Sequence, residues 1–136
     1  MRVRNFMLAE AIGGADGYHY IHGAGFTGLN VQRFPYTHPT ISVYLTLVRE
    51  QQDPDGAHDL QVELRDSSGQ ARGMLVQSSI ELPKQPGGSD PLVLTYVGNC
   101  AGLHFPQPGV YWVTLSFDDR ELDRLAINVA AHNPPQ

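Results

Sequence analysis

The segment QPGVYWVTLSFDDRELDRLAINV, residues 107–129, decides the fold class, because hydrophobic and polar residues alternate along both of its halves. Alternation with a period of two is typical of half-buried strands, in which successive side chains point to opposite sides. Pro108-Gly109 starts the first half, and the charged run of residues 118–121 supplies a reversal. The residues sharing one face are Tyr111, Val113, Leu115 and Phe117 in the first half, and Leu125, Ile127 and Val129 in the second. We therefore predict a β-hairpin.

The rest of the chain shows the same pattern in short segments that are separated by turn residues. The predicted strands are residues 3–11, 18–23, 29–33 (a short edge strand), 40–48, 58–65, 70–82 and 92–97. Glycines in residues 13–17 predict the turn of an N-terminal hairpin. Residues 83–91 are predicted to form a solvated loop. Residues 98–106 are expected to be irregular. The only helical alternative concerns residues 1–12.

Many short strands without a long helix predict an all-β protein of about eight strands. We expect an antiparallel β-sandwich with immunoglobulin-like topology, and an up-and-down barrel is the alternative. The chain has 136 residues, which is the size of one domain. Residues 1–130 are expected to form this single sandwich domain, and residues 131–136 a flexible C-terminal tail.

Composition excludes several classes of function. The formal net charge is −5 and the nine Lys and Arg residues do not cluster, so binding to nucleic acid or to an anionic membrane surface is not expected. Cys100 is the only cysteine, which excludes an internal disulfide and a cysteine-based zinc site. No signal peptide or membrane-spanning run is recognisable. We expect a cytoplasmic protein.

The order of several short motifs resembles the pattern of a family of small bacterial proteins classified only as a domain of unknown function. The segments are Leu8-Ala9-Glu10-Ala11, Asp16-Gly17, Ile21 to Phe26, Phe34-Pro35, His38-Pro39, His58-Asp59-Leu60, Asp66, Gly69 and Pro108 to Tyr111. The resemblance covers most of the chain. It implies an all-β sandwich and carries no assigned activity.

Acidic residues at predicted strand ends are one set of candidate ligand-binding residues. Asp53 and Asp55 have the two-residue spacing common among calcium ligands, and Asp118 and Asp119 lie in the turn of the 107–129 hairpin. Aspartate is also a preferred turn residue, which is the simpler interpretation. The six histidines form no His-x-His pair, so we expect structural or solvent-facing histidines and no metal site.

Trp112 is a second candidate, because it lies on the face of its strand opposite to the inward residues. It either packs under residues 98–106 or marks a contact surface, where tryptophan is enriched. Cys100 and His104 could form a nucleophile and base only if a bent loop brought them together.

The sequence therefore predicts a non-enzymatic β-sandwich module that acts through protein–protein contact, including self-association, without a cofactor. The alternative is a carbohydrate- or calcium-dependent binding module that uses the acidic loops. The candidate binding residues are Trp112, Asp118, Asp119, Asp53 and Asp55.

Overall fold

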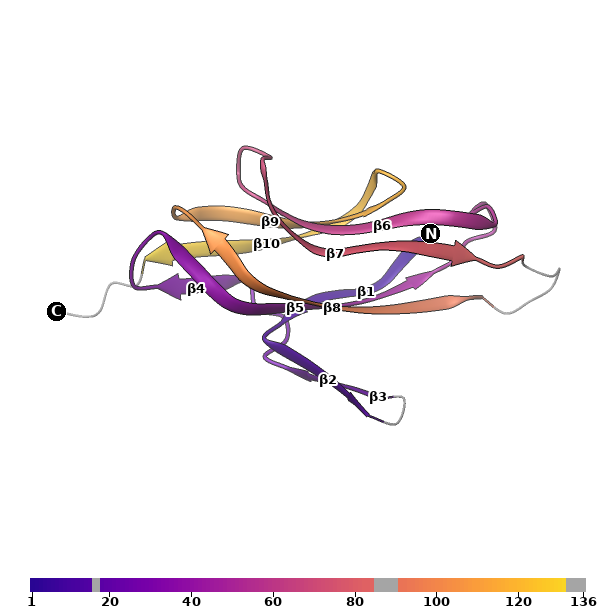
Figure 1. The fold of residues 1–136 in the computed structure, drawn as a ribbon, viewed down its shortest axis with the longest axis horizontal. Helices are drawn as coiled ribbons and strands as arrows, with labels where there is room; N and C mark the ends of the chain where they lie inside the picture. Colours follow the sequence, from indigo (N-terminus) through magenta and orange to yellow (C-terminus); the bar gives the residue numbers. More distant parts are fainter. Residues whose placement is uncertain (16–17, 85–90, 132–136) are drawn as a thin grey trace.

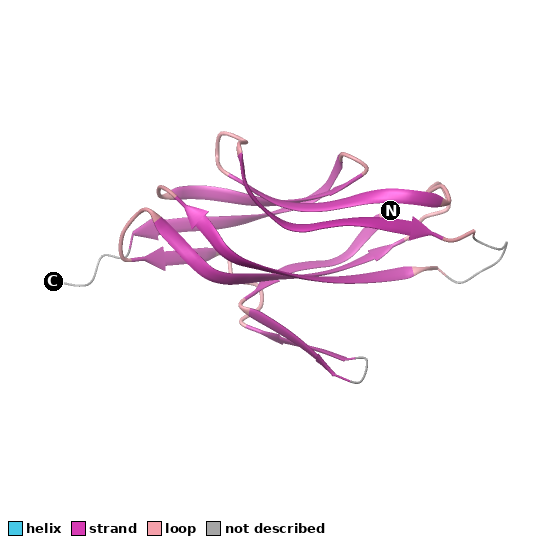
Figure 2. Cartoon of the chain, viewed as in Figure 1, coloured by secondary structure: helices cyan, strands magenta, loops and turns pink. Residues whose placement is uncertain are grey.

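The computed structural model describes residues 1–15, 18–84 and 91–131, and these residues contain strands and no helix (Figures 1 and 2). The strands are β1 (Arg2–Ala9), β2 (Ala11–Ala15), β3 (Tyr18–His22), β4 (Gly28–Val31), β5 (Tyr36–Val48), β6 (Gly56–Arg65), β7 (Ala71–Leu82), β8 (Val93–Phe105), β9 (Gly109–Phe117) and β10 (Arg120–Ala131). The all-β prediction is confirmed, and the described part of the chain has ten strands where about eight were expected.

The strands form three sheets. One sheet has the order β1-β5-β8, a second the order β4-β10-β9-β6-β7, and β2 and β3 form a separate hairpin. The first two sheets lie one above the other in Figure 1. The prediction of a purely antiparallel arrangement is wrong at one edge, because β4 pairs in parallel with the end of β10.

The core lies between these two sheets and uses the faces that alternation predicts. All four residues expected to face inward on β9 are buried, and Leu60, Val62 and Leu64 of β6 are fully buried opposite them. Ile41, Val43, Leu45 and Leu47 of β5 line the other side of the same core. Residues 118 and 119 alone form the turn between β9 and β10, which is shorter than the predicted reversal.

Two segments that lie outside the predicted strands, residues 36–39 and 98–105, are strands in the structure. Residues 98–105 continue β8, which pairs with β5 along its whole length, and β5 begins at Tyr36. Pro39 is tolerated within β5 because the recorded pairing passes from His38 to Thr40 and omits it. Small residues interrupt the hydrophobic alternation along β8, so the sequence pattern there does not indicate a strand. Pairing with β5 nevertheless satisfies the hydrogen-bonding N–H and C=O groups of its backbone.

The N-terminal hairpin exists, with a different first strand from the one predicted. β1 pairs with β5, the chain bends at Glu10, and β2 then pairs with β3. Gly13 and Gly14, which were predicted to form the turn, lie within β2, and residues 16 and 17 are outside the described residues. In Figure 1 this hairpin extends away from the β1-β5-β8 sheet. The predicted loop at 83–91 and the predicted tail fall largely outside the described residues.

Candidate functional site

A hollow on the outer face of the five-stranded sheet contains two of the predicted binding residues, Trp112 and Asp119. Because the alternate residues of β9 face the core, Trp112, Thr114 and Ser116 face outward and line this hollow. Its volume is about 410 Å³. The β6–β7 and β9–β10 turns both rise from the sheet on this side in Figure 1, and residues of both turns line the hollow.

Trp112 lies between two arginines from the neighbouring strands. The guanidinium carbon of Arg124 is 4.7 Å from the centre of the Trp112 ring, which is a cation–π contact. Arg65 pairs in register with Trp112 on the other side and forms an ion pair of 2.6 Å with Glu63. Trp112 is half-buried under Arg124 in this hollow, and the alternative packing under residues 98–106 is not observed.

The β6–β7 turn is fixed by a single carboxylate. Oδ1 of Asp66 accepts hydrogen bonds from the amide of Ser68 at 3.0 Å, its hydroxyl at 2.6 Å and the amide of Gln70 at 3.0 Å. Oδ2 accepts from Nε of Arg72 at 2.9 Å. These donors, led by the Ser68 hydroxyl, lower the pKa of Asp66 to about 2. These hydrogen bonds define the conformation of the turn, which forms one wall of the hollow.

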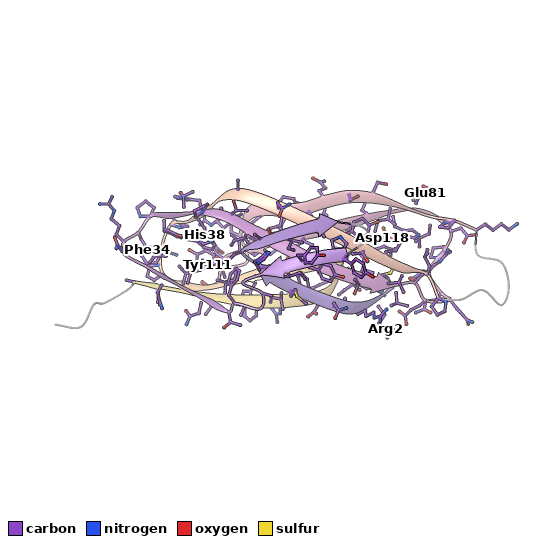
Figure 3. The ribbon with its side chains drawn as sticks, turned by 90° about the horizontal axis from the view of Figure 1, so that it is seen from below. Arg2, Phe34, His38, Glu81, Tyr111 and Asp118 are labelled. Atoms are coloured by element: carbon purple, nitrogen blue, oxygen red, sulfur yellow. The ribbon has the colours of Figure 1, made fainter. Side chains whose placement is uncertain are left out.

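The other three predicted acidic residues form a cluster at one end of the molecule, which we call the end cluster: Asp53 and Asp118 lie near His58, and Asp55 is two residues from Asp53 and bound to Arg49. Nδ1 of His58 lies 2.5 Å from Oδ2 of Asp118, and its Nε2 lies 2.7 Å from the carbonyl oxygen of Pro54. Oδ1 of Asp118 accepts a hydrogen bond of 2.9 Å from the amide of Asp59. Figure 3 shows Asp118 in the same half of the molecule as Arg2 and Glu81.

Asp53 and Asp55 are each bound to a cation of the protein itself. Asp53 pairs with the amino group of Met1 and accepts a hydrogen bond of 2.8 Å from the amide of Glu50. Asp55 pairs with the buried guanidinium of Arg49 at 2.5 Å. The pKa of Asp53 is lowered, because these hydrogen bonds and the nearby positive charge outweigh the opposing effect of burial.

The five predicted binding residues therefore divide between two places. Trp112 and Asp119 line the hollow on the sheet, whereas Asp53, Asp55 and Asp118 belong to the end cluster. Within the described ranges, no group of three or more His, Cys, Asp or Glu side chains is arranged to hold a metal ion.

His58 is the residue of the end cluster that the sequence analysis did not select. One signal was available, because His58 is in phase with the inward-facing Leu60 and Val62 of its own strand. Its partner Asp118 is 60 positions away, and no local pattern connects the two.

Cys100 and His104 do not form a catalytic pair. They are four positions apart on β8, and that separation spans roughly 13 Å along a strand. Burial raises the pKa of the Cys100 thiol, which disfavours the reactive thiolate. Nδ1 of His104 lies 3.2 Å from the hydroxyl of Thr37 instead.

The described residues form an all-β fold with a hollow on the outer face of its five-stranded sheet. Residues 4–130 match a family of unknown function, DUF6941. The match covers most of the chain, so the protein belongs to this family, and the resemblance stated from the sequence motifs is confirmed. No curated protein matches the chain. The structure contains no helix, in the portion it describes, that could cross a membrane.

Proposed function

We propose that the protein is a non-enzymatic β-sandwich module of the immunoglobulin-like type that acts through protein contact at the Trp112 hollow. Its Tyr111 supports the immunoglobulin-like assignment. The buried Tyr111 hydroxyl donates a hydrogen bond of 2.6 Å to the carbonyl oxygen of Gln107, four residues upstream. Such a tyrosine corner is a feature of these sandwiches. The single cysteine is in keeping with a cytoplasmic location.

The observation that carries the proposal is the half-buried Trp112, which lines the hollow with the Arg124 guanidinium over its ring. Tryptophan and arginine dominate the energetics of protein interfaces, because they bury large areas and keep polar groups for hydrogen bonds. An exposed cation–π pair contributes only about 0.5–1 kcal/mol.

A second copy of this chain fits the charges of the hollow. Arg124, Asp119 and Glu121 are exposed, and none of them takes part in an ion pair recorded among the described residues. A two-fold symmetric interface must be self-complementary, so a surface with both signs of charge can pair with its own copy. Arg124 of one protomer would then meet Glu121 or Asp119 of the other, around the two Trp112 rings.

The test is sedimentation velocity over a wide range of protein concentration. We expect the mass to rise from 15.0 kDa toward that of a dimer. The Trp112→Ala, Arg124→Glu and Glu121→Arg variants should each weaken the dimer. Combining Arg124→Glu with Glu121→Arg should restore it, because the charges are exchanged and remain complementary.

Arg4→Glu is the matched control, since Arg4 is an exposed arginine of β1 in the other sheet. A mass of one chain at every concentration would contradict self-association. A dimer that is weakened by Arg4→Glu and unaffected by Arg124→Glu would place the interface elsewhere and would also overturn the proposal.

Carbohydrate binding in the same hollow is the second candidate. A flat indole beside the carboxylates of Asp119 and Glu121 provides a stacking surface and hydrogen-bond acceptors for sugar hydroxyls. Arg124 would have to leave the ring face for a sugar to stack there. The fluorescence of Trp112, the only tryptophan, reports this directly. Neutral oligosaccharides should change its emission if this candidate is correct, and no change would exclude stacking of these sugars on the ring.

A further inference from the structure

His58 is held by acceptors on both sides of its ring. The side chain is almost completely buried, and its ring stacks on Phe117 with centroids 5.0 Å apart and planes 19° apart. The acceptor on one side is the Asp118 carboxylate of the β9–β10 turn. On the other side it is the Pro54 carbonyl of the β5–β6 loop. The imidazole therefore bridges two segments that are distant in sequence.

The two acceptors fix the protonation of the ring. A carbonyl oxygen only accepts hydrogen bonds, so Nε2 must carry a proton. The hydrogen bond from His58 and the one from the Asp59 amide lower the pKa of Asp118, so its carboxylate is ionised at neutral pH and also only accepts. Nδ1 must then carry a proton as well. With both nitrogens protonated, His58 is a positively charged imidazolium.

Charges from every neighbouring element act on this group. The hydrogen bond to Asp118 makes the largest contribution in raising the pKa of His58; the Pro54 carbonyl and the negative charge of Asp53 raise it further, while burial opposes them. Arg120 lines, together with His58 and Asp118, a second cavity that is separate from the Trp112 hollow. The Met1 amino group is bound to Asp53.

We propose that His58 is a proton-dependent latch that holds the β5–β6 loop against the β9–β10 turn and releases the loop when its imidazolium loses a proton. Neutral imidazole has one N–H group, so one nitrogen would face an acceptor with its lone pair. The charged Asp118 is the stronger acceptor and keeps the remaining proton on Nδ1. The bond to Pro54 is the one that breaks, so the loop loses its attachment to His58 of β6 but remains bound through its ion pairs with Met1 and Arg49, while the turn stays in place.

The pH range follows from the direction of the pKa. A histidine whose pKa is raised on folding contributes its full stabilisation below the unfolded pKa of about 6.5. That contribution is lost as the pH rises through the higher pKa of the folded state. The latch is therefore closed in mildly acidic solution and opens on the alkaline side of 6.5.

The test is NMR of the imidazole nitrogens combined with amide hydrogen exchange, corrected for intrinsic rates, across this pH range. We expect both nitrogens of His58 to be protonated at a pH near its unfolded pKa, with a midpoint above it. Above the midpoint, the amides of Glu50 and Asp53, which bond within the loop, should lose protection. The amides of Asp59 and Asp118, which join β6 to the turn, should keep theirs.

Two variants separate the latch from a merely structural histidine. Asp118→Asn keeps an acceptor for the Asp59 amide and removes the charge, so the His58 midpoint should fall by about one pH unit or more. His58→Gln cannot donate to both acceptors and should abolish the pH dependence of loop protection. His22→Gln, which changes an exposed histidine, is the control and should preserve it. A singly protonated His58 in the wild-type protein below pH about 6.5, or loop protection unchanged across the midpoint, would overturn the proposal.

Discussion

Gly98 of β8 lies so close to Val76 of β7 that a Cβ atom on Gly98 would overlap Cγ2 of Val76 and lie 3.0 Å from the Leu75 carbonyl oxygen. β7 is the edge of the five-stranded sheet and β8 is the edge of the three-stranded one. The two sheets therefore approach each other on this side with no space for a side chain. A glycine at this position is required by packing between sheets, because its φ angle is not in the left-handed region.

Replacing Gly98 with alanine should destabilise the fold by about 2–3 kcal/mol, since overpacking forces backbone to move. Gly73→Ala is the matched control. Its Cβ would meet only the flexible end of Leu103, at 2.8 Å, and should cost less than about 1 kcal/mol. Urea unfolding of both variants measures the difference, and equal costs would show that the sheets can separate slightly at this edge.

The Tyr111 hydroxyl should contribute measurably to stability. Tyr111→Phe removes its hydrogen bond to the Gln107 carbonyl and should lower the free energy of unfolding by about 1 kcal/mol. Tyr20→Phe serves as the comparison, because Tyr20 is 55% exposed and its loss should cost less than about 0.5 kcal/mol. The same urea titration measures both variants. If Tyr111→Phe left the free energy of unfolding unchanged, the tyrosine corner would be stabilised by packing of the ring on Phe105 and not by the hydrogen bond.

The ionisation of Asp66 should make the stability of the fold depend on pH in the acidic range. Because its pKa is lowered to about 2, the ionised carboxylate stabilises the fold above its usual pKa of 3.8, and this contribution is lost as the pH falls toward 2. Thermal melts of Asp66→Asn should therefore show a lower midpoint at neutral pH and a smaller loss in acid than the wild type. Glu81→Gln, at an exposed position, should leave both unchanged.

Calcium should have no effect on stability if the acidic residues are engaged as the structure shows. Asp53 and Asp55 are paired with Met1 and Arg49, and Asp118 is paired with His58. We expect the thermal midpoint to be the same with calcium and with a chelator, because only a ligand that binds the folded state raises it. An upward shift with calcium would favour the calcium-dependent alternative.

The faces of the strands could be predicted from the sequence because alternation is a local property. Leu60, Val62 and Leu64 of β6 are buried as the pattern indicates. The second half of β8 could not be predicted, since Gly98 and Gly102 suggest a loop when considered locally. Gly98 is there because β7 approaches it, and this reason is visible only in three dimensions.

The candidate site likewise contains residues that could be predicted from the sequence and contacts that could not. Trp112 could be selected because it departs from the inward pattern of its own strand, and Asp119 because it lies in the charged turn of the same hairpin. The pairing of His58 with Asp118 could not be predicted, because the two residues meet only after β6 and β9 have paired. Arg124 lies over Trp112 because of the register in which β9 pairs with β10. A bulge between Glu121 and Asp123 shifts this register.

Asp118 and Asp119 are the two residues of one turn, and both have positive φ angles, 50° and 63°. Asp118 is bonded to His58, whereas the next residue lines the Trp112 hollow. One peptide group thus joins the residue that binds the buried His58 to a residue that lines the hollow. Positive φ at both positions is the geometry that a two-residue hairpin turn requires, so a substitution that disturbs the turn should affect both the His58 contact and the hollow.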